Sequence, residues 1–383
     1  MSVTASGGKD HVIGSYAYAS LPEAAARHPL APARGLYSSD SWLELLRGHG
    51  HRYRWLLMCA QERAAALAPV TDGPAVRSGR YRPDFLLHER LPAERCVVAG
   101  PRTGYLNELR YGPERLPAAE VAEGLLAAAP QEPPPDAALL PYLPSGPAAA
   151  FETAGHPAGL IAWDAWLDVP GTGFDGYLAG LDKTHRKQVK DDLRRFTMAG
   201  VAFSTRPLTG PDDETDDLLV LHERMYGTVY DRPGSRFSRY LARCAELPGA
   251  YVVRARLAGR TVGCHLVFHY GDVLWVRLIG VDETRPGTRG CYFGLMFYEP
   301  LRLAHELGAR AVHLGIGTSR AKSRRGARLE PLWTVAVTAG GRARDLAREG
   351  LAARALDLPD PAPEGGGPAP ESPSEWERPS WAG

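Results

Sequence analysis

The stretch of sequence that decides the fold spans residues 250–281 and reads AYVVRARLAGRTVGCHLVFHYGDVLWVRLIGV. Runs of β-branched and aromatic residues alternate here with two short turn sequences, AGR at 258–260 and GD at 271–272. Because such short connections join antiparallel neighbours, the pattern predicts a meander of three strands. We expect these strands at residues 250–256, 261–270 and 273–281.

The residues that follow the meander complete one structural unit. They predict a long helix at about 291–307 and a strand at 311–315. The first half of the chain repeats the order with two strands, a helix and a strand, at 53–59, 64–70, 117–129 and 137–142. A duplicated α+β unit is the simplest account of this repetition. Two unrelated small domains are the alternative.

A strand predicted at residues 160–169 passes from one half to the other. A helix starts near Phe174 behind it. Thr184 is then expected to cap a second helix that runs to Ala199, with Gly200 as its stop.

The fold class is therefore α+β, with two domains in tandem at about residues 10–160 and 161–345. Each is expected to hold a mixed, mostly antiparallel sheet flanked by helices. Residues 358–383 are rich in Pro and Gly and cannot bury enough apolar surface to offset their ordering entropy, so we expect a disordered tail there.

Composition excludes several classes of protein. The chain has 383 residues, 44% of them hydrophobic and 23% charged, with a formal net charge of +1, so a wholly basic nucleic-acid coat is excluded. No apolar run reaches the length of a membrane helix and no signal core starts the chain. We expect a cytoplasmic protein that binds neither a membrane nor DNA. Its five widely spaced cysteines favour buried, reduced thiols over disulfides or a metal site.

The sharpest charge signal is a basic helix. The chain holds only five lysines, and Lys183, Lys187 and Lys190 fall within one window, where their spacing puts them on one helix face with Arg194. Arg186 lies among them, and three apolar residues mark the opposite face. Such a face suits contact with phosphates. An ordinary solvated helix face, partly offset by two neighbouring aspartates, is the alternative.

A loop at residues 282–292 joins the meander to the long helix. Gly287 and Gly290 allow close backbone approach, and the helix start beyond them offers free N–H groups to an anion, with Arg289 adding positive charge. A simple turn is the alternative reading of this loop.

A second loop, residues 313–328, leaves the end of the last buried strand. Ligands often sit beyond such strand ends. Two glycines clear space there, and Lys322 follows with Arg324 and Arg325. A cation aimed at a carbonyl oxygen lowers the barrier to acyl transfer. A flexible basic surface loop is the alternative.

Five further residues are candidates for the site. His265 lies on the middle strand, out of phase with its apolar neighbours, and is placed to accept a proton from an amine. Trp275 and Arg277 alternate with the aliphatic residues of their strand, so we expect them on its other face. There they would contact an adenine ring or an acyl chain of the donor. Tyr226 and Tyr230 are four apart on a helix and would form a substrate wall. Structural packing explains each of them equally simply. The aliphatic side of the last strand is expected to hold Leu274, Val276 and Leu278.

The order of these elements resembles the Fem family of aminoacyl-tRNA-dependent transferases (FemA, FemB, FemX), and above all the FemAB-related GNAT proteins of biosynthetic clusters. The resemblance is clearest over residues 161–333. The family's aromatic-Lys-x-x-Phe-Gly pattern corresponds to residues 321–326, which read AKSRRG: the lysine and the glycine are retained, and Ala321 and Arg325 replace the two aromatic residues. It implies that Lys322 faces the aminoacyl ester carbonyl. Residues 284–289 resemble the GNAT pyrophosphate loop, Gln/Arg-x-x-Gly-x-Gly/Ala, but depart from it at Thr284 and Arg289.

Three functions follow from these patterns. The resemblance implies a transferase that moves an aminoacyl group from aminoacyl-tRNA to an amine or hydroxylamine, in natural-product biosynthesis such as that of an antibiotic. A GNAT N-acyltransferase that uses acyl-CoA is the first alternative, and a non-catalytic binding protein on a degenerate GNAT scaffold is the second. The acyl donor is a co-substrate in the first two, so no resident cofactor or metal is expected. The chain lacks the H-E-x-x-H, Walker and G-x-S-x-G motifs of other enzyme classes.

Overall fold

The structure, a computed structural model, describes most of the chain. The chain divides into two compact units, Met1–Trp163 with Pro331–Asp360, and Asp164–Glu330. The described residues are 3–8, 11–18, 32–48, 51–60, 63–76, 79–111, 116–127, 134–210, 213–226 and 236–358. The expected tail therefore lies outside the described residues, apart from Leu358.

The sheet of the first unit has the strand order β1-β2-β3-β4-β5-β7-β14, with β6 beside β4. Among the described strands of this unit, β5 and β7 alone pair in parallel. The strands are β1 Val3–Gly8, β2 His11–Tyr18, β3 Arg54–Ala60, β4 Arg63–Asp72, β5 Cys96–Ala99, β6 Arg110–Tyr111, β7 Ala137–Pro144 and β14 Arg328–Thr338. The helices are α2 Asp40–Gly48, α3 Pro83–Leu86, α4 Ala118–Ala127, α5 Ser145–Thr153 and α13 Gly341–Leu356, with short 3-10 turns η1 Leu36–Ser38, η2 Gly73–Ala75, η3 Gly79–Tyr81 and η4 Ala93–Arg95.

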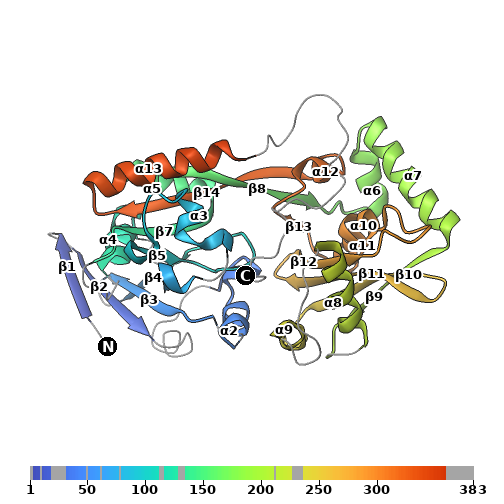
Figure 1. Cartoon of the computed structure of the whole chain (residues 1–383), viewed down its shortest axis with the longest axis horizontal. Helices are drawn as coiled ribbons and strands as arrows, with labels where there is room; N and C mark the ends of the chain where they lie inside the picture. The colour runs from blue at the N-terminus through green and yellow to red at the C-terminus, as the bar shows by residue number, and fades with distance from the viewer. Residues whose placement is uncertain are drawn as a thin grey trace. The chain divides into compact units, whose positions relative to one another are not determined.

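The sheet of the second unit has the order β8-β13-β12-β11-β10-β9 (Figure 1). Within the part of this unit that the structure describes, β12 and β13 form the one parallel pair. The strands are β8 Ala158–Asp168, β9 Val201–Pro207, β10 Ala250–Leu257, β11 Arg260–Tyr270, β12 Val273–Val281 and β13 Ala311–Gly315. The helices are α6 Gly173–Gly180, α7 Lys183–Ala199, α8 Asp213–Tyr226, α9 Arg236–Cys244, α10 Cys291–Phe293, the π-helical turn η5 Gly294–Tyr298, α11 Glu299–Glu306 and α12 Ser319–Ser323.

The predicted meander and its flanking elements are confirmed. Strands β10, β11 and β12 follow one another antiparallel, and α10, η5 and α11 together form the long helix expected before β13. The first unit repeats the plan, because hairpin β3–β4 precedes α4 and β7. The expected α+β fold, with mixed, mostly antiparallel sheets flanked by helices, is confirmed.

The units divide the chain differently from the expected boundaries. Strand β8 crosses the division at residues 163 and 164, and β14 brings the chain back to the first unit. Residues 331–345, expected in the second domain, therefore pack with the first. Val335 and Val337 of β14 lie in its hydrophobic core beside Leu140 of β7. A boundary set by a returning strand has no composition signal in the sequence.

The cap of α7 also differs in detail from the expectation. Asp182, rather than Thr184, is the N-cap, and its carboxylate accepts from the N–H groups of Thr184 and His185 at 2.8 and 2.9 Å. Gly200 ends the helix in the left-handed conformation, φ +74°, as predicted. All five cysteines are free and buried, as expected. Among the described residues, no helix is both long and apolar enough to cross a membrane.

One β-bulge shifts the pattern of β12. Leu266 pairs with Leu278 but Val267 pairs with Val276, so Arg277 is an extra residue in the strand. Beyond it, Ile279 and Val281 join the core beside the long helix, and Leu278 turns to the face that α8 covers. The expectation that Leu278 shares a face with Leu274 and Val276 is therefore wrong.

Candidate functional site

A pocket of about 340 Å³ opens in the second unit, beside the start of the long helix. Four parts of the chain build it: the middle of α7, the loop between β12 and α10, α10 itself, and Arg325 of the segment after α12. Three arginines face two carboxylates in its lining, which gives it a positive balance. The lining residues are Gln188, Asp192, Arg195, Glu283, Arg289, Gly290, Tyr292, Phe293 and Arg325.

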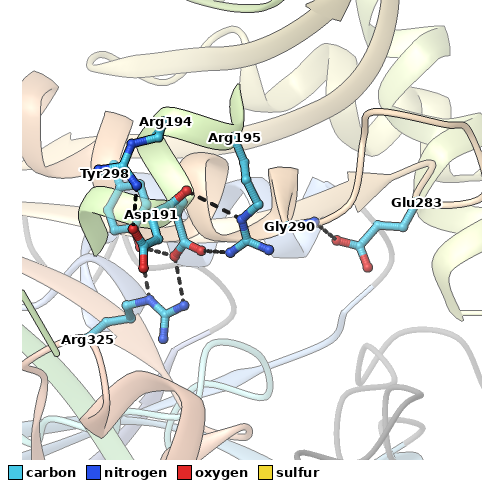
Figure 2. A network of polar contacts seen from close by, with 8 residues as sticks. Asp191, Arg194, Arg195, Glu283, Gly290, Tyr298 and Arg325 are labelled. Carbon is cyan, nitrogen blue, oxygen red and sulfur yellow. Dashed lines mark hydrogen bonds and ion pairs between the residues drawn. The ribbon is translucent and has the colours of Figure 1, made fainter. Parts of the chain in front are cut away.

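The buried carboxylate of Asp192 organises one wall of this pocket. Its Oδ2 accepts from Arg325 Nη2 at 2.8 Å and from the Tyr298 hydroxyl at 2.6 Å, and its Oδ1 accepts from Arg195. Arg325 Nε also donates to the Tyr298 hydroxyl, at 2.9 Å (Figure 2). Burial raises the pKa of Tyr298, although Arg325 opposes the shift, so the phenol stays protonated and donates to Asp192.

Arg325 is thus an internal anchor as well as a pocket wall. Its guanidinium stacks over the Phe293 ring at 4.0 Å, and its own carbonyl accepts from the Tyr177 hydroxyl at 2.8 Å. It is 2% exposed, and its ion pair with Asp192 compensates its charge. The sequence assigned Arg325 to the donor site but gave no sign of the carboxylate that holds it.

The opposite wall is the loop after β12. Gly287 and Gly290 both adopt positive φ, +88° and +83°, which favours glycine. Arg289, predicted as a donor-binding residue, is exposed and lines the pocket. Glu283, however, accepts from the Gly290 N–H at 3.2 Å (Figure 2). A carboxylate of the chain itself therefore occupies the helix start where the sequence predicted room for an anion.

The basic face of α7 is present and points to solvent. Lys183, Lys187 and Lys190 are exposed, and none of them has an ion pair or side-chain hydrogen bond within the described part of the chain. Arg194 is also exposed and pairs with Asp191 at 2.9 Å. Three exposed lysines without a partner in the described chain thus share one face of α7, the helix that also forms a wall of the pocket.

Arg186 does not belong to that face. Its guanidinium turns back along the chain and donates to the carbonyls of Leu178, Ala179 and Leu181 at 2.8, 3.0 and 2.6 Å. These carbonyls end α6, where a helix leaves its last acceptors unsatisfied. Arg186 therefore joins α6 to α7. Its guanidinium is engaged by these carbonyls, which does not favour the expected contact with the donor.

Lys322 is buried, with 2% of its surface exposed, at the end of β13. Its ammonium donates to the carbonyls of Leu314, Gly315 and Ile316 at 2.8, 2.9 and 2.9 Å. An ammonium has three hydrogens, so three such carbonyls are enough to engage its donors. Lys322 would have to give up one of these bonds to meet a substrate carbonyl. Arg324, nearby on the same segment, is half-buried.

His265 is wholly buried and faces the long helix rather than a cleft. In η5 the Glu299 N–H donates five residues back, to the Gly294 carbonyl. The next carbonyl, that of Leu295, would need the N–H of residue 300, which is a proline and has none. His265 Nδ1 supplies that donor at 2.7 Å, and burial lowers the pKa of the ring to about 4. A structural role thus accounts for this histidine.

The two site candidates on β12, Trp275 and Arg277, are also covered by other parts of the unit. Trp275 is 1% exposed and packs edge-on against Trp166, which does not suit contact with a ligand ring. Arg277 is half-buried, on the face covered by α8 and α9, close enough to Tyr240 and His222 to affect their pKa values. Tyr226 ends α8 and its side chain lies outside the described residues, as does Tyr230 entirely.

Comparisons with known proteins agree with this architecture. Residues 183–323 match the family model described as acetyltransferase (GNAT) domain, whereas no curated protein sequence matches the chain. L-PGS from Bacillus licheniformis is 12% identical, with a TM-score of 0.53 over 85% of this chain and 98% of that one. FemX is 11% identical, with a TM-score of 0.52 over 81% and 93%.

A third similar structure is the C-terminal domain (DUF2156) of a putative lysylphosphatidylglycerol synthetase from Agrobacterium fabrum. It is 16% identical, with a TM-score of 0.50 over 74% of this chain and 83% of that one. Likenesses at such low identity show the fold alone. The family match, over residues 183–323, supports a GNAT-type acyltransferase fold for the second unit.

Proposed function

We propose that this protein transfers an aminoacyl group from aminoacyl-tRNA to a small amine or hydroxylamine, in natural-product biosynthesis. The second unit holds the donor, with the lysine face of α7 against the RNA and the pocket beside it receiving the charged end. The protein acts in the cytoplasm, where tRNA is available.

The observation that carries the proposal is the unpaired lysine face of α7. Lys183, Lys187 and Lys190 have no partner in the described chain, whereas Asp192 on the buried side of the same helix is saturated. A protein of net charge +1 gains little from keeping three exposed cations on one face unless they meet an anion. A polyanion with spaced phosphates matches that row. The Fem resemblance of the sequence and the FemX-like fold agree with this donor.

The transfer itself requires no enzyme nucleophile. The acceptor amine attacks the ester carbonyl of the aminoacyl group, a C–N bond forms, and the C–O bond to the terminal ribose breaks. The proton lost by the amine ends on the ribose hydroxyl that leaves. The protein's part is to align the two reactants and to favour the oxyanion. In this proposal Lys322 acts by fixing the carbonyls at the end of β13, or as a direct donor after one of its bonds opens.

The test is an assay with charged tRNA, an amine panel and ribonuclease. We expect a product that ribonuclease abolishes and acetyl-CoA does not support. The variant Lys187→Ala with Lys190→Ala should weaken tRNA binding and flatten its salt dependence by about one to two units of log K per log salt concentration. Its matched control is Arg342→Ala with Arg348→Ala, which removes two exposed cations from α13. Equal salt slopes for the two double variants would contradict the RNA contact.

An acyl-CoA donor is the second candidate, because the matched family model is that of an acetyltransferase domain. Under this alternative Glu283 competes with the donor's phosphates for the Gly290 N–H. Glu283→Gln should then tighten CoA binding, measured by calorimetry, and CoA should be released during turnover. No turnover with either donor would favour the non-catalytic binding protein.

A further inference from the structure

Arg102 is a buried cation without a carboxylate. It is 3% exposed and follows β5 by three residues, in the first unit. Arg110 and Arg325 are buried to a similar degree, and each has an ion-pair partner, Asp40 and Asp192. Arg102 has no ion pair anywhere in the described chain. Charged side chains are rarely buried in this way unless they are paired.

The groups around Arg102 are further donors with unmet hydrogen bonds. Its Cζ lies 4.4 Å from the centre of the Tyr53 ring, which lies 6.0 Å from that of Trp55. Arg102 Nη2 donates to the Arg52 carbonyl at 2.9 Å, but Arg102 Nε and Trp55 Nε1 are buried without an acceptor among the described residues. The buried Tyr53 hydroxyl makes no hydrogen bond of normal geometry either. Arg102 Nε and Trp55 Nε1 can only donate, and the Tyr53 hydroxyl can also donate, so this point combines unmet donors with one full positive charge.

The chain holds Arg102 in this inward position. The next residue, Thr103, accepts from the indole N–H of Trp42 at 3.2 Å on α2. Gly104 follows at φ +100°, and a Cβ there would lie 2.2 Å from the Tyr37 ring. A hydrogen bond at Thr103 and close packing at Gly104 therefore fix the loop just after Arg102. The loop itself thus holds the guanidinium in its buried position.

Position in the sheet supports a ligand at the same point. Strand β5 pairs in parallel with β7, and Arg102 lies just beyond the carboxyl end of β5. Ligands of mixed sheets commonly sit beyond the carboxyl ends of parallel strands. An unpaired buried cation in such a position costs stability unless an anion joins it.

We propose that Arg102, Trp55 and Tyr53 form a binding site for a small anionic group, a carboxylate or a phosphate, in the first unit. The guanidinium supplies the charge and a planar set of donors, and the indole and phenol hydrogens complete the shell. The site is separate from the pocket of the second unit and does not depend on the donor proposed above.

The test is titration of the full chain with inorganic phosphate and, separately, with acetate, at constant ionic strength, followed by calorimetry and by thermal unfolding. We expect saturable binding and a matching rise in the unfolding midpoint with one of the two probes, which identifies the group. Arg102→Met should weaken that binding by about tenfold or more. Arg82→Met, at an exposed arginine of the same unit, should leave it unchanged.

Folding of Arg102→Met is itself informative. Without the anion this variant should be at least as stable as the wild type, because it removes an uncompensated buried charge. If it fails to fold, Trp55→Phe provides the second variant, and it should weaken binding by a few fold through the loss of one donor. Binding of neither probe to the wild type, or binding that survives both substitutions, would overturn the proposal.

Discussion

The two loops that follow the first strand of each parallel pair differ in how they balance charge. The loop after β12 pairs its own Arg285 with Asp282 at 3.0 Å, and beside it Arg195 of α7 and Arg325 behind α12 converge on Asp192, so this part of the second unit carries its own counter-ions. After β5, Arg102 rests on a carbonyl and an aromatic ring alone. At equivalent positions of the two units, a buried arginine can therefore either have a carboxylate partner within the chain or be left to bind an anion from outside. Topology alone does not decide which.

The second unit shows two other ways to bury a basic group. Lys322 Nζ donates to three backbone carbonyls, whereas burial lowers the pKa of His265 to about 4, so that its ring is neutral near pH 7. The loss of stability on replacing each group should depend on how its charge is balanced. Arg102 has no counter-ion, so its replacement should cost the least.

The largest effect is expected from Arg325→Met. This variant leaves the buried Asp192 carboxylate with only Arg195 and Tyr298 as partners. Loss of one partner of a buried ion pair costs about 3–5 kcal/mol of unfolding free energy. Urea unfolding of the full chain measures this. The double variant Arg325→Met with Asp192→Asn should recover part of the loss. If Arg325→Met and Arg102→Met lower stability equally, the contrast between the two loops fails.

Lys322→Met should follow, with a loss of about 2–3 kcal/mol from carbonyls left without a donor. Turnover should fall with it, because the end of β13 loses its fixed shape. Lys322→Arg keeps a positive charge, but a planar guanidinium cannot reach the three carbonyls in the same way. If Lys322 acts by fixing these carbonyls, this variant should lose stability and turnover as well. Full stability combined with lost turnover in Lys322→Met would instead favour direct contact between the ammonium and the substrate.

The smallest effect concerns His265 and acid. Its folded pKa, about 4, lies below the ordinary value of 6.5, so the unfolded chain binds the proton first. Its contribution is complete above pH 6.5 and is lost as the pH falls toward 4, by about 2 kcal/mol at pH 5. His265→Gln should remove this part of the acid slope in unfolding experiments. His222, also buried with a lowered pKa, should keep the remainder, and an unchanged slope would contradict the assignment.

Much of the fold was predictable because its signals are local. Turn residues at 258–260 and 271–272 fixed the meander, and Gly200 fixed the end of α7. The π-helical turn was not predictable, since Pro300 leaves the Leu295 carbonyl without a backbone donor and the donor that replaces it, His265, lies 30 residues earlier in the chain. The bulge at Arg277 and the return of β14 to the first unit likewise follow from packing between distant segments.

The site was predictable only where charge faces solvent. The lysine face of α7 and Arg289 lie where spacing placed them. Asp192 looked like an offsetting surface charge, but it is the buried centre of the pocket wall. Its spacing of four from Phe196 and three from Val189, both buried, was the available signal. Arg102 had no signal at all, because whether an arginine finds a carboxylate is decided by tertiary contacts.

The path of the chain has a consequence for biosynthesis. Residues Asp164–Glu330 are inserted into the sequence of the first unit, whose core needs Val335 and Val337 of β14. Domains generally fold as units while the ribosome elongates the chain. The inserted unit is therefore complete before the unit that begins ahead of it. Until β14 emerges, the edge of β7 and the apolar residues beside it remain exposed, so the nascent first unit, and not the second, is the expected client of chaperones.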